Sequence, residues 1–285
     1  MKKLILSAFA VCLSLPLASA DKIKALILDG QNNHNWKATT PVLRHALESC
    51  GKYTVEVATS PAKGQDMSGW NPDFSKHDVI VSNYNGAMWS EQTQKAFVDY
   101  VKNGGALVVI HAADNSFGKW EEYNKMIALG GWGGRNETSG PYLYFKDGEF
   151  LRDNSKGGGG SHGPQHEFTV TIRDANHPIT KGMPTEWKHM KDELYDSLRG
   201  PAENVTVLAT AWSEKSKKHE PMMLCIQYGK GRVFHTPMGH ADYSMRCVGF
   251  YNTLQRGTEW AATGAVTLPL DKNFPGKDSV AEVTP

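Results

Sequence analysis

The chain has 285 residues, in which 31 lysines and arginines almost balance 30 aspartates and glutamates. The formal net charge of +1 gives no electrostatic reason to expect nucleic-acid binding. The length suits one large α/β domain or two small ones.

The first 20 residues have the pattern of a secretory signal sequence. Two lysines precede an apolar run over 4–17, and residues 18–20 (ASA) form a small-residue cleavage site. We therefore expect a mature chain that begins at Asp21, carries a net charge of −1 and is periplasmic or secreted. Serine and proline interrupt the apolar run, which argues against a membrane anchor, and no later stretch is apolar enough to span a bilayer.

Three cysteines remain after the predicted cleavage: Cys50, Cys225 and Cys247. Because the number is odd, they cannot all pair within one chain, although one disulfide could form. The sequence therefore does not predict a disulfide-dense fold.

The first half of the chain alternates predicted strands and helices, as parallel sheets do. Strands are expected over 22–29, 53–58, 78–83 and 106–110, and helices over 41–50 and 91–103. The uninterrupted apolar run ALVVI at 106–110 predicts a strand buried on both faces. Right-handed crossovers bring the loops after such strands to one edge of the sheet, where open α/β sheets bind ligands.

The second half of the chain is less regular. A short helix is expected over 120–129, strands over 166–172, 205–209, 222–228 and 232–236, and a final helix over 245–262. Residues 130–165 show no periodicity and include four consecutive glycines, which predicts a mobile insertion. Residues 265–285 are expected to form a loosely packed C-terminal tail, so that the domain covers 21–264.

Three histidines, His34, His111 and His240, each follow a predicted strand and lie in a polar or small-residue loop. Imidazole is an acid/base group near neutral pH and a common metal ligand. Together with Glu193, they could be catalytic residues or could hold a zinc or manganese ion. No short metal-binding spacing decides between these roles. The structural alternatives are a histidine satisfied inside a turn at 111 and a solvated carboxylate at 193.

Four residues in or after the predicted strands are candidates for substrate binding: Asp29, Trp36, Asn85 and Asp114. Trp36 could form a sugar-stacking surface with Trp89 and Trp132, although the common role of such aromatic residues is core packing.

The other histidines of the second half are expected to be structural or exposed. His166 opens an alternating strand and is predicted to face solvent, whereas His235 lies inside a strand. His177 precedes a proline and is expected to hold a turn, and His162 falls in the glycine-rich insertion.

The segments ILDGQNNHNW, WSEQTQKAFVDYVKNGGALVVIHAAD, HPITKGMP, DELY, YGKGRVFHTPMGH and LQRGTEWAATG occur in this order along the chain. As a set they resemble the ThuA-like family, which is named for trehalose utilisation, and the resemblance runs from about residue 22 to residue 264. It implies the class I glutamine amidotransferase-like fold. This is an α/β, flavodoxin-like three-layer sandwich with a mostly parallel central sheet.

The resemblance also argues against glutamine hydrolysis. In glutamine amidotransferases a nucleophilic cysteine follows the strand that corresponds to 106–110, and His111 holds that position here. Cys225 falls in a predicted strand and Cys247 in a predicted helix. Asn35 stands where relatives often carry aspartate, which removes a carboxylate from that loop.

The family is associated with the catabolism of trehalose and related disaccharides through 3-keto-glycosides. A keto group acidifies the neighbouring C–H, so a base could remove that proton and the glycosidic oxygen could leave, with a metal or an imidazolium stabilising the enediolate. The resemblance thus implies an exported carbohydrate-catabolic enzyme that acts by hydrolysis, elimination or isomerisation. The alternatives are a non-catalytic carbohydrate-binding or scaffold domain and a metal-dependent hydrolase of another small substrate.

Overall fold

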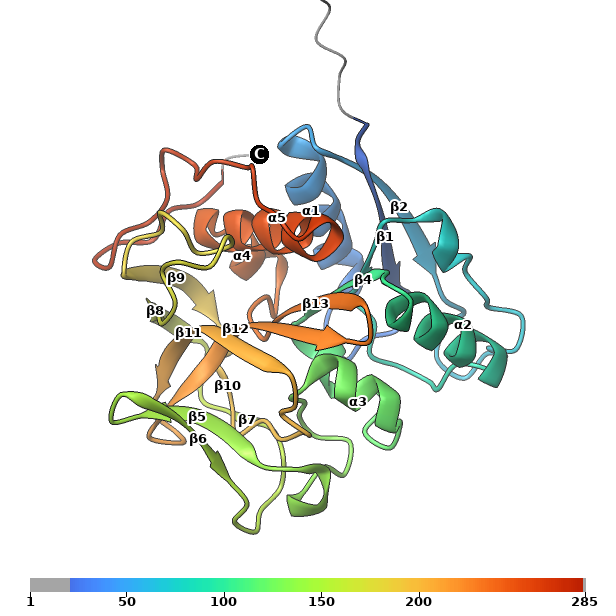
Figure 1. Cartoon of the computed structure of the whole chain (residues 1–285), viewed down its shortest axis with the longest axis horizontal. Coiled ribbons are helices and arrows are strands. Elements are labelled where there is room, and N and C mark those ends of the chain that lie inside the picture. The colour runs from blue at the N-terminus through green and yellow to red at the C-terminus, as the bar shows by residue number, and fades with distance from the viewer. Residues whose placement is uncertain (1–20, 284–285) are drawn as a thin grey trace, which may run out of the picture.

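The computed structural model of the chain describes residues 21–283 and has a central sheet with helices on both faces (Figure 1). The predicted signal sequence lies outside the described residues. One half of the sheet is parallel and the other half is antiparallel.

The parallel half contains five strands. In spatial order these are β2 (Tyr53–Thr59), β1 (Ile23–Asp29), β3 (Val79–Ser82), β4 (Ala106–Ile110) and β13 (Gly231–Thr236). The four strands predicted in the first half of the chain are thereby confirmed. Every residue of β4 is buried, as its uninterrupted apolar sequence predicts.

Helices form a layer on each face of these strands. Helices α1 (Trp36–Ser49) and α5 (Val248–Thr263) cover one face, and α2 (Glu91–Lys102) and α3 (Glu121–Ile127) cover the other. Alternate residues of β4 divide between the two cores, so that Val108 packs in the core with α5 and Val109 in the core with α2. The predicted three-layer arrangement is therefore confirmed. Helix α1 begins earlier than predicted, with Pro41 inside it.

The antiparallel half extends the sheet beyond β13. It comprises β12 (Lys218–Tyr228), β11 (Val205–Ser213), β8 (His166–Ile172) and β9 (Glu186–Asp192), in that order. The sheet is consequently mixed, and the prediction of parallel pairing holds for its first half. No strand was predicted over the residues that form β9. A short helix, α4 (Asp242–Met245), precedes α5.

Residues 130–165 are structured, so the prediction of a mobile insertion is wrong. They form a 3₁₀ turn (Glu137–Ser139), the hairpin of β5 (Tyr142–Lys146) and β6 (Glu149–Asp153), and β7 (Ser161–His162), which pairs with β10 (Tyr195–Asp196). The buried Arg199 guanidinium donates hydrogen bonds to the carbonyls of Gly140, Ser155 and Gly157. Hydrogen bonds from the buried Arg199 guanidinium to backbone carbonyls therefore hold this region in place, rather than the packing of a periodic apolar face.

The C-terminal segment also packs against the domain. Leu268, Leu270 and Phe274 contact the core beside α5, and the Arg256 guanidinium donates to the Leu268 carbonyl. Among residues 265–283 only Pro275 is buried, so this segment lies on the surface and is anchored by these few contacts. Two further 3₁₀ turns lie at Phe74–Lys76 and His111–Asn115.

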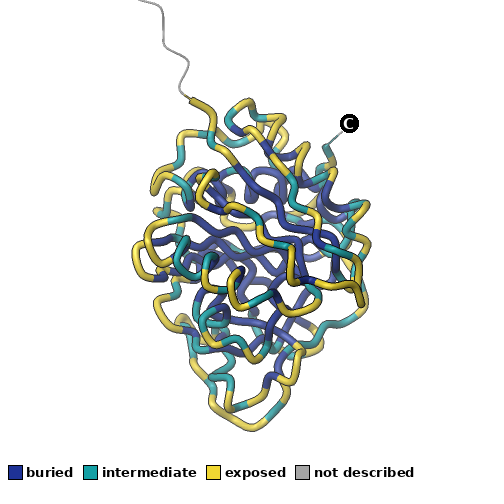
Figure 2. The backbone as a smooth tube through the Cα atoms, turned by 90° about the vertical axis from the view of Figure 1, so that its right-hand side faces the viewer, coloured by how far each residue is buried: buried dark blue, intermediate teal, exposed yellow. Residues whose placement is uncertain are grey.

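Burial follows this layering. The strands run through the interior, and exposed residues gather on the connecting loops (Figure 2). Within residues 21–283, no helix has the length and apolar character that a membrane crossing requires.

Replacing Gly257 with alanine tests how closely α5 packs on β13. A Cβ at this position would meet the Phe234 ring closer than real Cβ contacts allow. We expect Gly257→Ala to lower the free energy of unfolding by about 1–3 kcal/mol, although alanine is the better helix former by about 1 kcal/mol. Urea unfolding measures this.

Gly69→Ala is the matched control, because nothing lies within 4 Å of its added Cβ. This control should leave stability nearly unchanged. A Gly257→Ala variant as stable as the parent chain would contradict the close packing.

Candidate functional site

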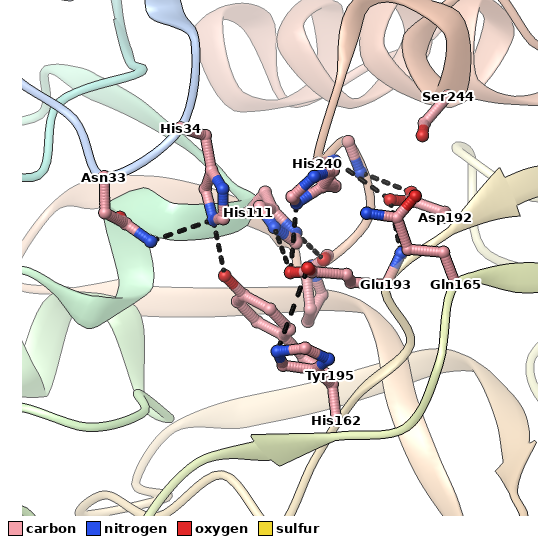
Figure 3. A network of polar contacts seen from close by, with 12 residues as sticks. Asn33, His34, His111, His162, Gln165, Asp192, Glu193, Tyr195, His240 and Ser244 are labelled. Atoms are coloured by element: carbon pink, nitrogen blue, oxygen red, sulfur yellow. Dashed lines mark hydrogen bonds and ion pairs between the residues drawn. The ribbon is translucent and has the colours of Figure 1, made fainter.

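Four side chains converge where the parallel strands end. His34 follows β1, His111 follows β4 and His240 follows β13, while Glu193 follows the antiparallel strand β9. One potential ligand atom from each lies within 4.8 Å of the others, and the side chains point toward one another (Figure 3). The prediction that these four residues share one rim is confirmed by this geometry.

His111 is held by both its backbone and its ring. Its φ of +42° lies in the left-handed region that side chains rarely adopt, which turns the chain sharply as β4 ends. Nδ1 is 2.7 Å from the Pro237 carbonyl oxygen, an acceptor only, so Nδ1 carries a hydrogen. In the neutral ring, Nε2 is then the atom with the free lone pair. The Tyr195 ring stacks on the imidazole with centroids 4.0 Å apart.

Three buried atoms of the cluster lack a hydrogen-bond partner: His111 Nε2, His240 Nδ1 and Glu193 Oε2. Glu193 Oε2 lies 3.0 Å from His240 Nδ1 and 3.6 Å from His111 Nε2, without hydrogen-bond geometry in either case. Buried polar atoms are seldom left unpaired. Three unpaired buried atoms that face one another can together bind a cation or a polar group of a substrate.

Burial and mutual contacts shift the pKa values of His34, Glu193 and His240 in different directions. Burial lowers the pKa of His34 to about 3, aided by the neighbouring His111 and His240, so this imidazole is neutral. Burial opposes the charged form of Glu193, but contact with His111 and His240 outweighs burial and holds its pKa well below its usual range. Burial lowers the pKa of His240, but contact with Glu193 outweighs burial and raises it. Because metal ions require neutral imidazoles and an ionised carboxylate, metal binding at this cluster would release a proton from His240.

Asp192 organises the site from beneath. Its Oδ1 accepts hydrogen bonds from the backbone N–H groups of Glu193 at 2.8 Å and His240 at 2.9 Å. Its Oδ2 accepts one from the Gly239 N–H at 2.7 Å and lies 2.8 Å from His189 Nε2. One fully buried carboxylate thus joins the segments that carry two members of the cluster.

His189 balances the charge of Asp192. Burial lowers the pKa of His189, but contact with Asp192 and with the Cys247 thiol outweighs burial and raises it to about 9. Burial alone would raise the pKa of Asp192, yet the pairing with His189 keeps it below its usual value. The two residues therefore form a buried ion pair near neutral pH.

Two residues that were not predicted to belong to the site, Tyr195 and His162, lie beside it, together with Trp132 from the predicted sugar-stacking surface. The Tyr195 hydroxyl is 3.1 Å from His34 Nε2 and accepts a hydrogen bond from the Asn115 amide. His162 Nε2 is 3.8 Å from Glu193 Oε1, so placing this histidine in a mobile insertion was wrong. The Trp132 ring lies 4.8 Å from that of Tyr195. None of these residues ends a long strand, and no periodic pattern marks them.

The predicted substrate-binding residues separate into two groups. Trp36 and Asn85 line a trough of about 560 Å³ next to His34, together with Asn32, Asn33 and Lys63. Asp29 and Asp114 are buried instead. Asp114 Oδ2 lies 3.2 Å from His235 Nε2 inside the core. His235 is accordingly structural, as expected.

Other predicted features also have clear places. Trp89 is buried in an aromatic cluster and cannot stack on a sugar, whereas Trp132 is 36% exposed. His166 is exposed, as predicted, and Ile179 N–H donates to His177 Nδ1 in a turn. Cys50, Cys225 and Cys247 are free thiols, and the latter two are buried, away from the nucleophile position that His111 occupies.

The chain was compared with known proteins. The sequence model of the ThuA family, described as trehalose utilisation, matches residues 24–261. A thuA-like protein from Parabacteroides merdae is 47% identical, with 92% of this chain and 98% of that chain covered and a TM-score of 0.90. A comparison with curated proteins finds no match.

Two more distant structures share the fold. A thuA-like protein from Bacteroides uniformis is 19% identical over 89% of this chain and 97% of that one, with a TM-score of 0.57. A β-galactosidase from Rahnella sp. R3 is 14% identical over 88% of this chain but 33% of its own, with a TM-score of 0.51.

Replacing Asp192 with asparagine tests its organising role. An asparagine side chain can replace one of the two acceptor oxygens, turns an N–H toward backbone donors and leaves His189 without a counter-charge. We expect Asp192→Asn to lower the free energy of unfolding by about 3–5 kcal/mol, as breaking a buried pair does. Urea unfolding near pH 6.5 measures the loss, with the exposed Glu167→Gln as control.

The pH dependence identifies the ion pair. The His189 pKa is raised from 6.5 to about 9, so its stabilising contribution is complete below pH 6.5 and is lost as the pH rises through 9. The stability difference between the parent chain and Asp192→Asn should therefore shrink over this interval. A difference below about 1 kcal/mol at pH 6.5 would show that Asp192 does not organise the site.

Proposed function

Because this chain belongs to the ThuA trehalose-utilisation family, we propose that it is an exported enzyme that acts on oxidised glycosides or disaccharides at the cluster of His34, His111, Glu193 and His240. The observation that carries the proposal is the convergence of three imidazoles and one carboxylate at the rim. Export is supported by the sequence pattern of residues 1–20.

The cluster fits a divalent metal ion. Three of its potential ligand atoms are buried, face one another and lack hydrogen-bond partners. Imidazole and carboxylate ligands suit zinc and manganese, the two ions that we propose. A bound ion would supply Lewis-acid stabilisation of negative charge on a substrate oxygen.

The surroundings of the cluster fit a carbohydrate. The trough beside His34 presents the amides of Asn33 and Asn85 and the ring of Trp36, and Trp132 and Tyr195 form an aromatic wall near Glu193. Amides can hydrogen-bond to sugar hydroxyls, and aromatic faces suit the apolar face of a pyranose. A surface on two sides of the cluster suits a substrate of two rings.

His162 is the residue that we propose as the proton carrier. Its Nδ1 is 2.8 Å from the Gly163 carbonyl and therefore carries a hydrogen, which leaves a lone pair on Nε2 in the neutral ring. The ring is partly exposed beside Glu193, within reach of a bound ligand. Nε2 would accept the proton from the carbon beside the keto group.

This proton transfer begins an elimination. The C–H electron pair forms a carbon–carbon double bond as the glycosidic C–O bond breaks, and the departing oxygen takes up one proton. The products are a free sugar and an unsaturated ketone, to which water can add. Positioned general bases contribute about 100- to 10,000-fold to such steps.

Metal binding tests the cluster directly. We expect the parent chain to bind one zinc or manganese ion and Glu193→Gln to bind it at least about 100-fold more weakly, since outer-shell changes alone cost up to that amount. Calorimetry with each ion measures this, with the exposed Glu167→Gln as the matched glutamate control. Equal affinity in the parent chain and in Glu193→Gln would rule out the cluster as the metal site.

Substrate turnover tests the reaction. We expect release of free sugar from 3-keto-trehalose but not from trehalose, with loss of activity in chelator, and a loss of about 100-fold or more in His162→Gln without loss of metal. His111→Gln should lose activity whether it acts as a ligand or as a base, and its metal content distinguishes the two roles. Binding of sugar without any turnover would instead support a carbohydrate-binding domain.

A further inference from the structure

A second groove, lined by residues outside the cluster, lies where the β5–β6 hairpin meets β11 and β12. Phe145 of β5 pairs with His219 of β12, which in turn pairs with Trp212 of β11. Residues directly opposite on neighbouring strands project from the same face of a sheet, so the three rings form a row. The Trp212 and His219 rings are 5.1 Å apart, and the groove has a volume of about 370 Å³.

Trp212 is held with its ring open to solvent. Its Nε1 donates a hydrogen bond of 2.9 Å to Glu214 Oε1, which fixes the plane of the indole. The side chain is nevertheless 42% exposed, more than either Trp132 or any other aromatic residue that the structure describes. A rigid exposed indole is a suitable platform for a flat apolar surface.

Positive charge borders this row of rings. The Arg173 guanidinium lies 3.9 Å from the centre of the Phe145 ring, and its Nε donates to Thr210 Oγ1. Its two Nη groups have no acceptor within the described part of the chain. Lys146, Lys217 and Lys218 also line the groove, together with the carboxylate of Asp147. Lys217 is paired with Glu214 and Lys218 with Asp153, so Arg173 and Lys146 are the cations left to attract an anion.

The groove thus combines an aromatic platform with a guanidinium fork whose Nη donors have no acceptor in the described part of the chain. An arginine fork matches the geometry of a carboxylate, and an aromatic platform with a few polar groups suits a small polar ligand.

We propose that this groove binds a sugar ring that bears a carboxylate, with the carboxylate on Arg173 and the apolar face of the ring on Trp212. The site is separate from the proposed catalytic cluster, so it goes beyond the proposed function and does not depend on it.

Titration with D-glucuronate tests the groove, using calorimetry and tryptophan fluorescence on the full mature chain. We expect binding with a Kd on the order of 1 mM, in keeping with the size of the ligand. Trp212→Ala and Arg173→Lys should each weaken it about 10-fold or more. Arg173→Lys keeps the charge and removes the fork, and the exposed position of Trp212 makes Trp212→Ala compatible with folding.

Trp132→Ala is the matched control, because Trp132 is the exposed tryptophan beside the proposed catalytic cluster. It should bind glucuronate like the parent chain. Equal weakening by Trp132→Ala and Trp212→Ala would place the ligand at the cluster and overturn the proposal. So would the absence of saturable binding, or binding of D-glucose or inorganic phosphate as tight as that of glucuronate.

Discussion

The buried carboxylate of Asp192 is the interaction on which the geometry of the site depends. It accepts hydrogen bonds from three backbone N–H groups and pairs with His189, so all of its strong acceptor positions are used in the core. Two of those N–H groups belong to Glu193 and His240 themselves. Because unsatisfied buried donors are costly, the loops after β9 and β13 cannot separate without losing these bonds. The carboxylate therefore sets the distance between the cluster members that those loops carry.

The mixed sheet explains why the site contains both imidazole and carboxylate side chains. Parallel pairing brings the ends of β1, β4 and β13 to one edge, and each end delivers a histidine there. The antiparallel extension returns β9 to the same edge, where Glu193 and Tyr195 follow it. Neither half alone would place a carboxylate among three imidazoles. The charge on Glu193 and the neutral state of His34 then follow from burial and from the contacts within the cluster.

Much of the parallel half could be predicted from sequence, because apolar runs such as 106–110 specify buried strands and right-handed crossovers specify where their ends meet. The ends of these strands are where His34, His111 and His240 were found. The remainder depends on contacts between distant segments. The organising role of Asp192 can be recognised only when its backbone partners are in place. His162 lies near Glu193 because β7 and β10, of two residues each, pair with one another. Arg199 holds the β5–β6 hairpin in part by hydrogen bonds to backbone carbonyls on either side of it. Such bonds produce no hydrophobic periodicity in the sequence.

We propose that three imidazoles and one carboxylate of this chain bind a single metal ion. X-ray absorption spectroscopy of the zinc-loaded protein identifies the ligand atoms themselves. We expect nitrogen and oxygen atoms bound to zinc at about 2.0–2.1 Å, with more distant scattering from about three imidazoles, and the loss of one imidazole in His240→Gln. Sulfur at about 2.3 Å, or a shell without imidazole scattering, would contradict it.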